Sequence, residues 1–259
     1  MTSQDEPLRP AAIRQRLKTR RIGQTIALFD SLPSTNRLAR DLAQDGVEEG
    51  AVVIAEEQTE GRGRKGRAWL SPARKGLWFS VVLRPCLPEP VQPLLGFTAA
   101  LAVVEAGRRC AGLDLAVKWP NDVYGGGKKL AGVLLEAVTA RIGRAVIVGI
   151  GVNVNSAASD FPEELRERAT SLRELARRPL DRSAVLCAVL EGMERRYDEL
   201  VSRGATPLLR EWRRLDLCLG RSIQVSSAGE AYRAEALTVD VDGSLLVRDG
   251  AGRTRRLWA

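Results

Sequence analysis

The sequence has 259 residues, and not one of them is histidine. This absence excludes every catalytic scheme in which a histidine activates a serine or cysteine nucleophile. Catalysis by this chain would therefore have to depend on positioning, on charge stabilisation, or on the chemistry of carboxylates and lysines.

Cysteine is scarce as well, because the chain has only four, at Cys86, Cys110, Cys187 and Cys218. They form no CxxC pair, and without histidine they cannot complete a common zinc-binding set. We therefore expect reduced thiols in the core, rather than a disulfide framework or a metal site made of cysteines.

Long apolar runs are also absent. The longest, such as AVIVGIGV, are far shorter than the ~20 residues that a membrane-spanning helix needs. The first residues, MTSQDEPLRP, have no apolar centre, so they do not resemble a secretory signal. With 44% hydrophobic and 28% charged residues, the composition predicts a globular protein of the cytoplasm without a membrane partner.

Positive charge, by contrast, is abundant, since 40 lysines and arginines oppose 32 acidic residues and give a net charge of +8. Such a surplus suits a polyphosphate substrate, an acidic partner protein or a nucleic acid. Charge alone does not distinguish among these three classes of partner.

The charge is most concentrated in residues 61–69, which read GRGRKGRAW. The three glycines free the backbone and expose N–H groups that can surround an anion. The arginines add planar forks that match phosphate or carboxylate oxygens. Because like charges repel, we expect this loop to be mobile when empty and to become ordered around an anion. Taken alone, it fits equally well a basic patch that binds nucleic acid non-specifically.

The hydrophobic pattern predicts a chain of mixed secondary structure. Strands are expected at 26–29, 51–55, 77–83, 113–119, 129–138 and 144–152, and helices at 12–18, from 34 to about 42, at 93–111, from an N-cap at Asp181 to about 201, and at 207–215. A tight turn is expected at 125–127. From about residue 217, short β segments separated by turns at 228–229 and 242–243 indicate a small barrel. The predicted domains are a lead with a short helix (1–22), a main domain (23–216) and the barrel (217–259).

Three further motifs accompany the glycine-arginine loop. They are KWPND at 118–122, GGGKKLAGVLLE at 125–136 and GIGVNVN at 149–155, with SLPSTN upstream at 31–36. In this order and at these separations, the set resembles the biotin protein ligases, which activate biotin with ATP and attach it to a lysine of a carrier protein. The resemblance runs from about residue 12 to the C-terminus.

The resemblance implies an α+β fold, in which a mixed-sheet catalytic domain of the biotin/lipoate ligase type with helices precedes a small SH3-like β-barrel. The residues before 23 leave no room for a helix-turn-helix domain, so we expect the form without a DNA-binding domain and without sequence-specific DNA binding. Family members usually continue to an arginine that helps to hold ATP, whereas this chain ends at RRLWA. The last barrel strand is therefore expected to be short or missing, which puts the barrel's part in ATP binding in doubt.

The implied reaction needs no general base for its first step. The carboxylate of biotin is ionised at neutral pH, attacks the α-phosphorus of ATP and displaces pyrophosphate, which leaves biotinyl-5′-adenylate. A carrier lysine then takes the biotinyl group and AMP departs. The task is to bring two anions together, and the resemblance assigns catalysis to Lys129 and Arg64. Lys128 is expected to face the solvent.

The resemblance also assigns the substrate contacts. Biotin would be bound by Ser34, Thr35, Asn36, Gln58, Gly61, Arg62, Gly63, Arg64, Lys129, Gly132 and Gly151. ATP and the adenylate would be bound by Arg64, Arg67, Trp69, Asn121, Asp122, Lys129 and Asn153, with Asp122 as a ligand of Mg²⁺.

Ordinary structural roles remain open for several of these residues. A Ser-Thr-Asn run at a helix start is commonly a cap, Asn121 and Asp122 suit a turn, and Gly132 and Gly151 could simply ease strand packing. Trp119 is expected to pack in the core.

Two rival functions remain at this stage. A lipoate ligase or octanoyl transferase has a similar core, but the transferases usually use a cysteine nucleophile, and none of the four cysteines lies in a recognisable motif. A basic nucleic-acid-binding protein would account for the charge, but not for KWPND or KKLAG. The resemblance implies a monomer or homodimer whose macromolecular partner is the biotin carrier domain of a carboxylase.

Overall fold

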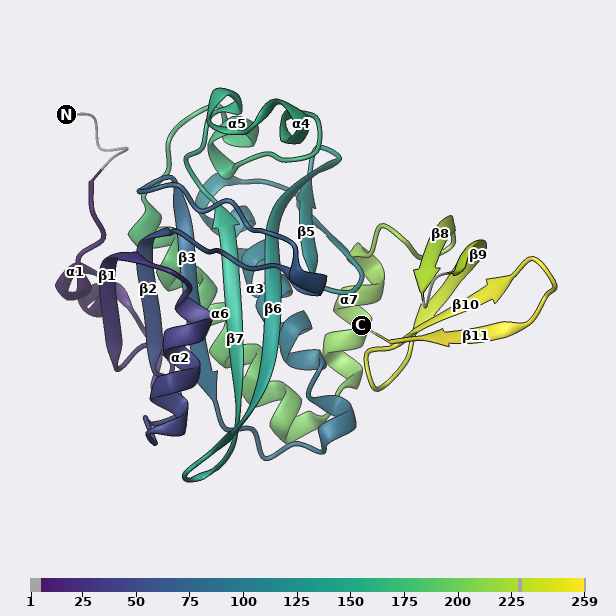
Figure 1. Cartoon of the computed structure of the whole chain (residues 1–259), viewed down its shortest axis with the longest axis horizontal. Coiled ribbons are helices and arrows are strands. Elements are labelled where there is room, and N and C mark those ends of the chain that lie inside the picture. The colour runs from purple at the N-terminus through teal and green to yellow at the C-terminus, as the bar shows by residue number, and fades with distance from the viewer. Residues whose placement is uncertain (1–5, 228–229, 259) are drawn as a thin grey trace.

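The computed structural model describes residues 6–227 and 230–258, and its larger part is built on a seven-stranded sheet (Figure 1). The strand order is β1-β2-β3-β7-β6-β5-β4. The strands are β1 (Ile26–Leu32), β2 (Val52–Gln58), β3 (Gly76–Leu83), β4 (Ala116–Lys118), β5 (Asp122–Gly125), β6 (Lys128–Ala140) and β7 (Gly143–Asn153). The pair β1–β2 is parallel and the other neighbouring pairs are antiparallel, which confirms the predicted mixed sheet.

Helices cover both faces of this sheet because its central strands are apolar on both sides. In β2, Val52 and Ile54 face the larger core, which includes residues of α3 (Leu94–Ala111), α6 (Arg182–Arg203) and α7 (Thr206–Leu215). Val53 faces the other side, where α2 (Thr35–Gln44) packs with its small residues. The shorter helices are α1 (Pro10–Arg16), α4 (Glu163–Arg166) and α5 (Leu172–Ala176), with 3-10 turns η1 (Arg64–Gly66), η2 (Glu89–Val91) and η3 (Ala158–Asp160).

One helical segment of the described residues, Glu89–Ala111, is long and apolar enough to cross a membrane, although 72% of its most apolar window is buried inside the fold. Such burial is typical of the central helix of a globular core. This agrees with the buried helix that the sequence predicts for 93–111.

The C-terminal part is a four-stranded antiparallel sheet in the order β11-β10-β9-β8. Its strands are β8 (Ser222–Ser227), β9 (Glu230–Val239), β10 (Leu245–Asp249) and β11 (Thr254–Leu257). The arrangement is consistent with the predicted small SH3-like domain. The expected turn at 242–243 is present, with Gly243 at a φ of 83°, whereas the one at 228–229 lies outside the described residues. The boundaries of the three predicted domains stay predictions.

Side chains of the larger part hold this small sheet in place. The Trp119 indole N–H donates to the carbonyl of Gly243 at 2.9 Å, and Arg213 donates to the carbonyl of Val239. Trp119 also packs against the main core, as the sequence analysis expected.

Two expectations from the sequence are wrong in detail. Strand β5 was missed because no strand was expected between 119 and 129 and a turn was placed at 125–127, although Asp122–Gly125 form a strand between β4 and β6. The cysteines are free, but they are not all core thiols: Cys187 and Cys218 are buried, Cys110 is half-buried and Cys86 is exposed.

Candidate active site

A cavity of about 1100 Å³ lies between the sheet and the C-terminal domain. Its walls come from the start of α2, the loop between β2 and β3, strands β5 to β7, the segment around α4, and strands β8, β10 and β11. Of the residues that the resemblance assigns to biotin and ATP, all but Gly61 line it. The motifs, far apart in the sequence, thus meet in one place.

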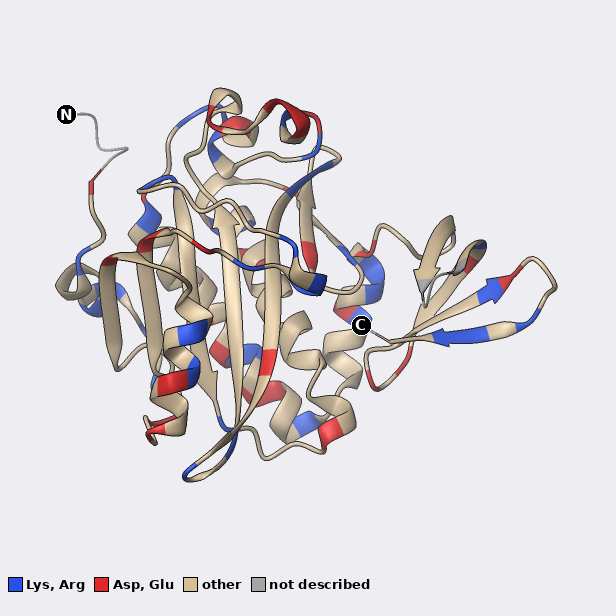
Figure 2. Ribbon diagram, in the orientation of Figure 1, with Lys and Arg blue, Asp and Glu red and all other residues tan. Residues whose placement is uncertain are grey.

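Cations dominate the lining of this cavity. They are Arg62, Arg64, Lys65, Arg67, Lys118, Lys129, Arg168 and Arg256, whereas Asp122 is the one carboxylate among the described lining residues. In Figure 2 the loop that carries several of them crosses in front of β6 and β7. Such a surplus of positive charge suits a substrate with several phosphates.

The glycine-arginine loop folds as a small hairpin over the sheet. The N–H of Gly63 donates to the carbonyl of Arg67 at 2.7 Å, and the N–H of Trp69 donates to the carbonyl of Gly61 at 2.8 Å. A side chain at Gly61 would place its Cβ 2.3 Å from the Trp69 carbonyl, so only glycine permits this closure. The loop's mobility in the empty enzyme stays a prediction.

Trp69 packs against a pair of glycines. Gly132 of β6 and Gly151 of β7 are register partners, and a Cβ on Gly151 would lie 2.4 Å from the Trp69 Nε1. The two glycines therefore make room for the indole, which is more than ease of strand packing. The buried Nε1 has no hydrogen-bond partner among the described residues, so it can donate to a ligand in the cavity.

Lys129 reaches into the cavity beside Trp69. Its Nζ lies 2.7 Å from Asp122 Oδ1 and 5.1 Å from the centre of the Trp69 ring. The Lys129 N–H donates to the carbonyl of Arg168, and its carbonyl accepts from Thr170, which fixes the backbone of this lysine. These contacts exclude the role of a freely solvated lysine at a strand start.

The neighbouring Lys128 does not line the cavity. Its side chain is 35% exposed, but it is not free in the solvent, because its Nζ donates to the carbonyl of Arg166 at 2.7 Å and lies 3.6 Å from Glu167. Lys128 thus fastens the α4 segment to β6.

Arg64 is half-buried, and its Nη1 donates to Asn121 Oδ1 at 3.4 Å. Burial lowers the pKa of Arg64 below its ordinary value, the negative charge of Asp122 opposes this shift, and the nearby Arg67 adds to it. A guanidinium that has lost water and faces another cation gains from a bound anion.

The start of α2 forms the opposite wall of the cavity. Ser34 occupies the N-cap position as expected, but its side chain makes no capping hydrogen bond. The Thr35 N–H donates to Gln58 Oε1 at 2.8 Å, and Gln58 Nε2 donates to Ser71 at 2.9 Å. Asn36 is turned toward β6, where its Nδ2 donates to Glu136 at 2.8 Å.

Two asparagines hold the cavity wall together. The Asn121 side chain donates to the carbonyl of Val133, and the Val133 N–H donates to the carbonyl of Asn121. Asn153 is buried, and its Nδ2 donates to the carbonyl of Thr170 at 2.9 Å. Asn121 therefore links β6 to Arg64, which is more than the role of a turn residue.

Outside the glycine-arginine loop, the sequence analysis missed three cations of the lining: Lys118, Arg168 and Arg256. Lys118 opens the KWPND motif and could have been found there, whereas Arg168 stands in no motif. Arg256, the fourth residue from the end, is held by Asp240, Asp242 and Ser244. The short C-terminus thus still carries an arginine to the cavity.

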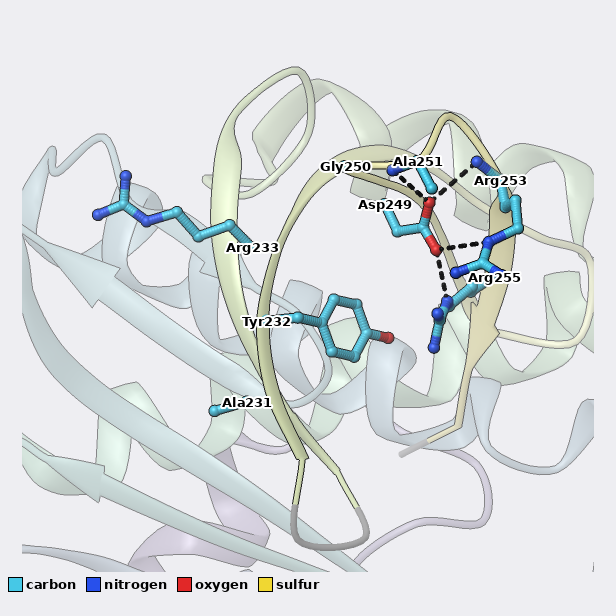
Figure 3. A pocket seen from close by; sticks show the side chains of 8 residues that line it. All are labelled: Ala231, Tyr232, Arg233, Asp249, Gly250, Ala251, Arg253 and Arg255. Atoms are coloured by element: carbon cyan, nitrogen blue, oxygen red, sulfur yellow. Dashed lines mark hydrogen bonds and ion pairs between the residues drawn. The ribbon is translucent and has the colours of Figure 1, made fainter.

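A second hollow, of about 450 Å³, lies on the C-terminal sheet (Figure 3). Its Asp249 accepts hydrogen bonds from the N–H groups of Ala251 and Arg253 and from the side chains of Arg253 and Arg255. These bonds, led by that from the Arg253 N–H, lower the pKa of Asp249 to about 2. The hollow contains none of the motif residues, and its carboxylate is committed to holding the β10–β11 turn.

Comparison with known proteins agrees with this geometry. The family described as "Biotin/lipoate A/B protein ligase family" matches residues 28–153. The bifunctional ligase/repressor BirA of Bacillus subtilis (strain 168) is 39% identical over 95% of this chain and 76% of its own length. The chain belongs to the biotin/lipoate A/B protein ligase family. The biotin–[acetyl-CoA-carboxylase] ligase of Mycobacterium tuberculosis is 34% identical over 98% of this chain and 96% of its own.

Solved structures of this family share the fold. The biotin protein ligase of Aquifex aeolicus in complex with biotin and ATP superposes with a TM-score of 0.80, at 29% identity over 91% of this chain and 96% of that one. The biotin protein ligase of Leishmania major in complex with biotinyl-5-AMP gives a TM-score of 0.65 at 25% identity, covering 91% and 99%. Both are biotin protein ligases, which favours biotin over lipoate as the acid.

Proposed function

We propose that this chain is an ATP-dependent biotin–protein ligase, which activates biotin as biotinyl-5′-adenylate and transfers it to a lysine of a biotin carrier domain. The observation that carries the proposal is the meeting of the four motifs in one cationic cavity, in a fold whose relatives include a biotin protein ligase in complex with biotin and ATP.

The wall at the start of α2 would bind the ureido ring of biotin. This ring offers one carbonyl acceptor and two N–H donors, and each needs a partner when water is excluded. The Ser34 hydroxyl makes no capping hydrogen bond and can bind a ligand, and Thr35 and Gln58 supply further polar atoms to the same wall. Asn36 also lines the cavity, but both ends of its amide are bonded, to Glu136 and Ser80, so its part would be to support this wall.

The loop and β6 would bring the two reacting anions together. Lys129 pairs with Asp122, and Arg64 donates to the adjacent Asn121, so both cations line the same part of the cavity. Both can neutralise charge that develops between the biotin carboxylate and the α-phosphate. Gly61 and Gly63 keep the hairpin closed, and Arg62, Arg64 and Arg67 then supply cations around the phosphates. No step requires histidine, since the nucleophile is already an anion.

Asp122 would help to hold the Mg²⁺ that accompanies ATP. Its Oδ1 pairs with Lys129 Nζ at 2.7 Å, and a carboxylate has two oxygens with about four lone-pair sites, so it keeps capacity for a ligand. One carboxylate with substrate phosphates is a usual setting for Mg²⁺, which would offset phosphate charge there. Asn121 and Asn153 would shape the nucleotide wall, and Trp69 would cover the adenylate.

The second step would use a carrier lysine that enters from solvent, consistent with a cytoplasmic enzyme acting on a carboxylase as a monomer or homodimer. A direct test is ATP–pyrophosphate exchange by the purified protein with biotin or lipoate as the acid. We expect exchange with biotin and Mg²⁺ that depends on both. Exchange with lipoate alone would overturn the proposal in favour of a lipoate ligase.

A further inference from the structure

A row of hydrogen-bonded polar side chains runs from Glu136 of β6 past the start of α2 to Gln58 at the cavity wall, and its middle members are buried. Glu136 Oε1 accepts from Asn36 Nδ2 at 2.8 Å, and Asn36 Oδ1 lies 2.6 Å from Ser80 Oγ. Ser80 Oγ lies 2.8 Å from Thr35 Oγ1, which lies 3.0 Å from Gln58 Oε1. Asn36, Ser80 and Thr35 are each at most 5% exposed.

The inner part of this row consists of Asn36, Ser80, Thr35 and Gln58. The oxygens at its two ends, Asn36 Oδ1 and Gln58 Oε1, can only accept hydrogen bonds. Gln58 Oε1 already accepts from the backbone N–H of Thr35. A carboxylate has no hydrogen to give, so Glu136 requires the NH₂ group of Asn36 to face it and turns Asn36 Oδ1 toward Ser80. The amide packs closely against Gly149, where a Cβ would lie 2.0 Å from this oxygen, so a glycine at this position leaves the room that the amide occupies.

The hydrogens of this inner part can be counted. Three oxygen–oxygen contacts join Asn36, Ser80, Thr35 and Gln58, but only the hydroxyls of Ser80 and Thr35 carry a hydrogen to place between them. One contact therefore always lacks a hydrogen. The cavity wall formed by Thr35 and Gln58 (the Thr35 wall) thus has more oxygen lone pairs than hydrogens to match them. A ligand that offers an N–H group compensates this surplus.

Reversal of the Asn36 amide would remove the shortage. Its Nδ2 would then donate to Ser80, Ser80 to Thr35, and Thr35 to Gln58, so that three hydrogens would fill three contacts. Reversal is unfavourable, because Asn36 Oδ1 would then face the carboxylate of Glu136, and two acceptors repel one another. The negative charge of Glu136 thus keeps the wall in its hydrogen-poor state.

We infer that Glu136 is a positioning residue for substrate recognition, which acts through Asn36 and Ser80 to make the Thr35 wall select an N–H donor of the ligand. The inference rests on the proposed function, in which that donor is a ureido N–H of biotin. Arg40, whose Nη2 lies 3.5 Å from Glu136 Oε2, is not required for this role, because the carboxylate alone orients the amide.

The test uses the full chain and calorimetric binding of biotin and of two lactam analogues, in each of which a methylene replaces one ureido N–H. Glu136→Gln keeps the shape but permits the reversed amide. We expect it to weaken biotin about tenfold, the scale of one hydrogen bond. The wild-type protein should bind biotin more tightly than the analogue that lacks the N–H facing Thr35. In Glu136→Gln we expect this ratio of affinities to be smaller by a similar factor.

Ser80→Ala is a second variant. It leaves one oxygen–oxygen contact, between Thr35 and Gln58, and one hydroxyl hydrogen to fill it, so it should also reduce the preference for biotin over the analogue. Arg40→Gln is the control and should leave the preference for biotin unchanged. The adenylation rate at saturating biotin should change little in Glu136→Gln, because the effect lies in ground-state binding. Equal losses for biotin and the analogues would mean a merely structural role and would overturn the inference, as would an unchanged preference. Absence of biotin binding by the wild-type protein would instead overturn the proposed function.

Discussion

At the scale of single residues, the site shows why neighbouring lysines have different roles. Lys128 and Lys129 alternate across β6, so one fastens a surface segment while the other points into the cavity beside Asp122 and Trp69. In the sequence, only the KKLAG motif distinguished the roles of these two lysines. Periodicity could place them on opposite faces of a strand, but it could not tell which face the cavity occupies.

Lys129→Ala tests the catalytic assignment. If this ammonium group stabilises charge mainly in the transition state, its loss should lower the rate of adenylate formation by roughly 10²–10³-fold, the scale for one preorganised donor. Biotin affinity should fall much less. Single-turnover kinetics and calorimetry measure the two quantities.

Lys128→Ala is the matched control, and it should leave the rate of adenylation within about twofold of wild type, because an exposed ion pair contributes little. Equal losses of rate and of biotin affinity in Lys129→Ala would assign this residue a ground-state role instead.

At the scale of secondary-structure elements, the elements with strong apolar periodicity were predictable. The helix over 93–111 and the N-cap at Asp181 are confirmed, since Asp181 accepts from the N–H groups of Ser183 and Ala184. Strand β5 was not predictable, because its four residues are too few to show a period. The seat of Trp69 on Gly132 and Gly151 depends on strand register, which local sequence does not reveal.

The glycine-arginine hairpin should act as a lid. Arg64→Gly removes a half-buried cation and adds backbone freedom, so it should weaken retention of the adenylate more than its formation. Released biotinyl-adenylate would then modify lysines of an added non-carrier protein. The measurements are biotin incorporation into that protein and protease protection of residues 61–68 with and without biotin plus ATP. Equal protection in both states, together with no leakage from Arg64→Gly, would contradict the lid.

A second element-scale prediction concerns the N-terminal lead. Arg182 of α6 and Glu56 of β2 form a buried ion pair at 2.6 Å, and they also bind the backbone of Glu6 and Leu8. Arg182→Met should lower the free energy of unfolding by about 3–5 kcal/mol, because it leaves a buried carboxylate without its partner. Urea unfolding measures this change.

The control for this prediction is Arg203→Met, which breaks an exposed pair with Glu199 and should cost less than about 1 kcal/mol. Similar losses in the two variants would show that the buried pair does not anchor the lead.

At the scale of the whole molecule, the cavity is completed by two parts of the chain. The sheet supplies Lys129 and Asp122, and the C-terminal sheet brings Arg256 to the same space through the hydrogen bond from Trp119 to Gly243 and the contacts of Arg213. Motif order predicted which residues meet. The contribution of the C-terminal strand could not be predicted, because β11 reaches the cavity only through the packing of the two parts.

The central claim is that this one cavity activates biotin and delivers it to a carrier lysine. The most direct measurement is intact-protein mass spectrometry of a purified biotin carrier domain after a single turnover with the enzyme, biotin, ATP and Mg²⁺. The account predicts a gain of one biotinyl group on the acceptor lysine, none on a carrier whose acceptor lysine is replaced by arginine, and release of AMP. An unmodified carrier, or equal modification of both carriers, would contradict it.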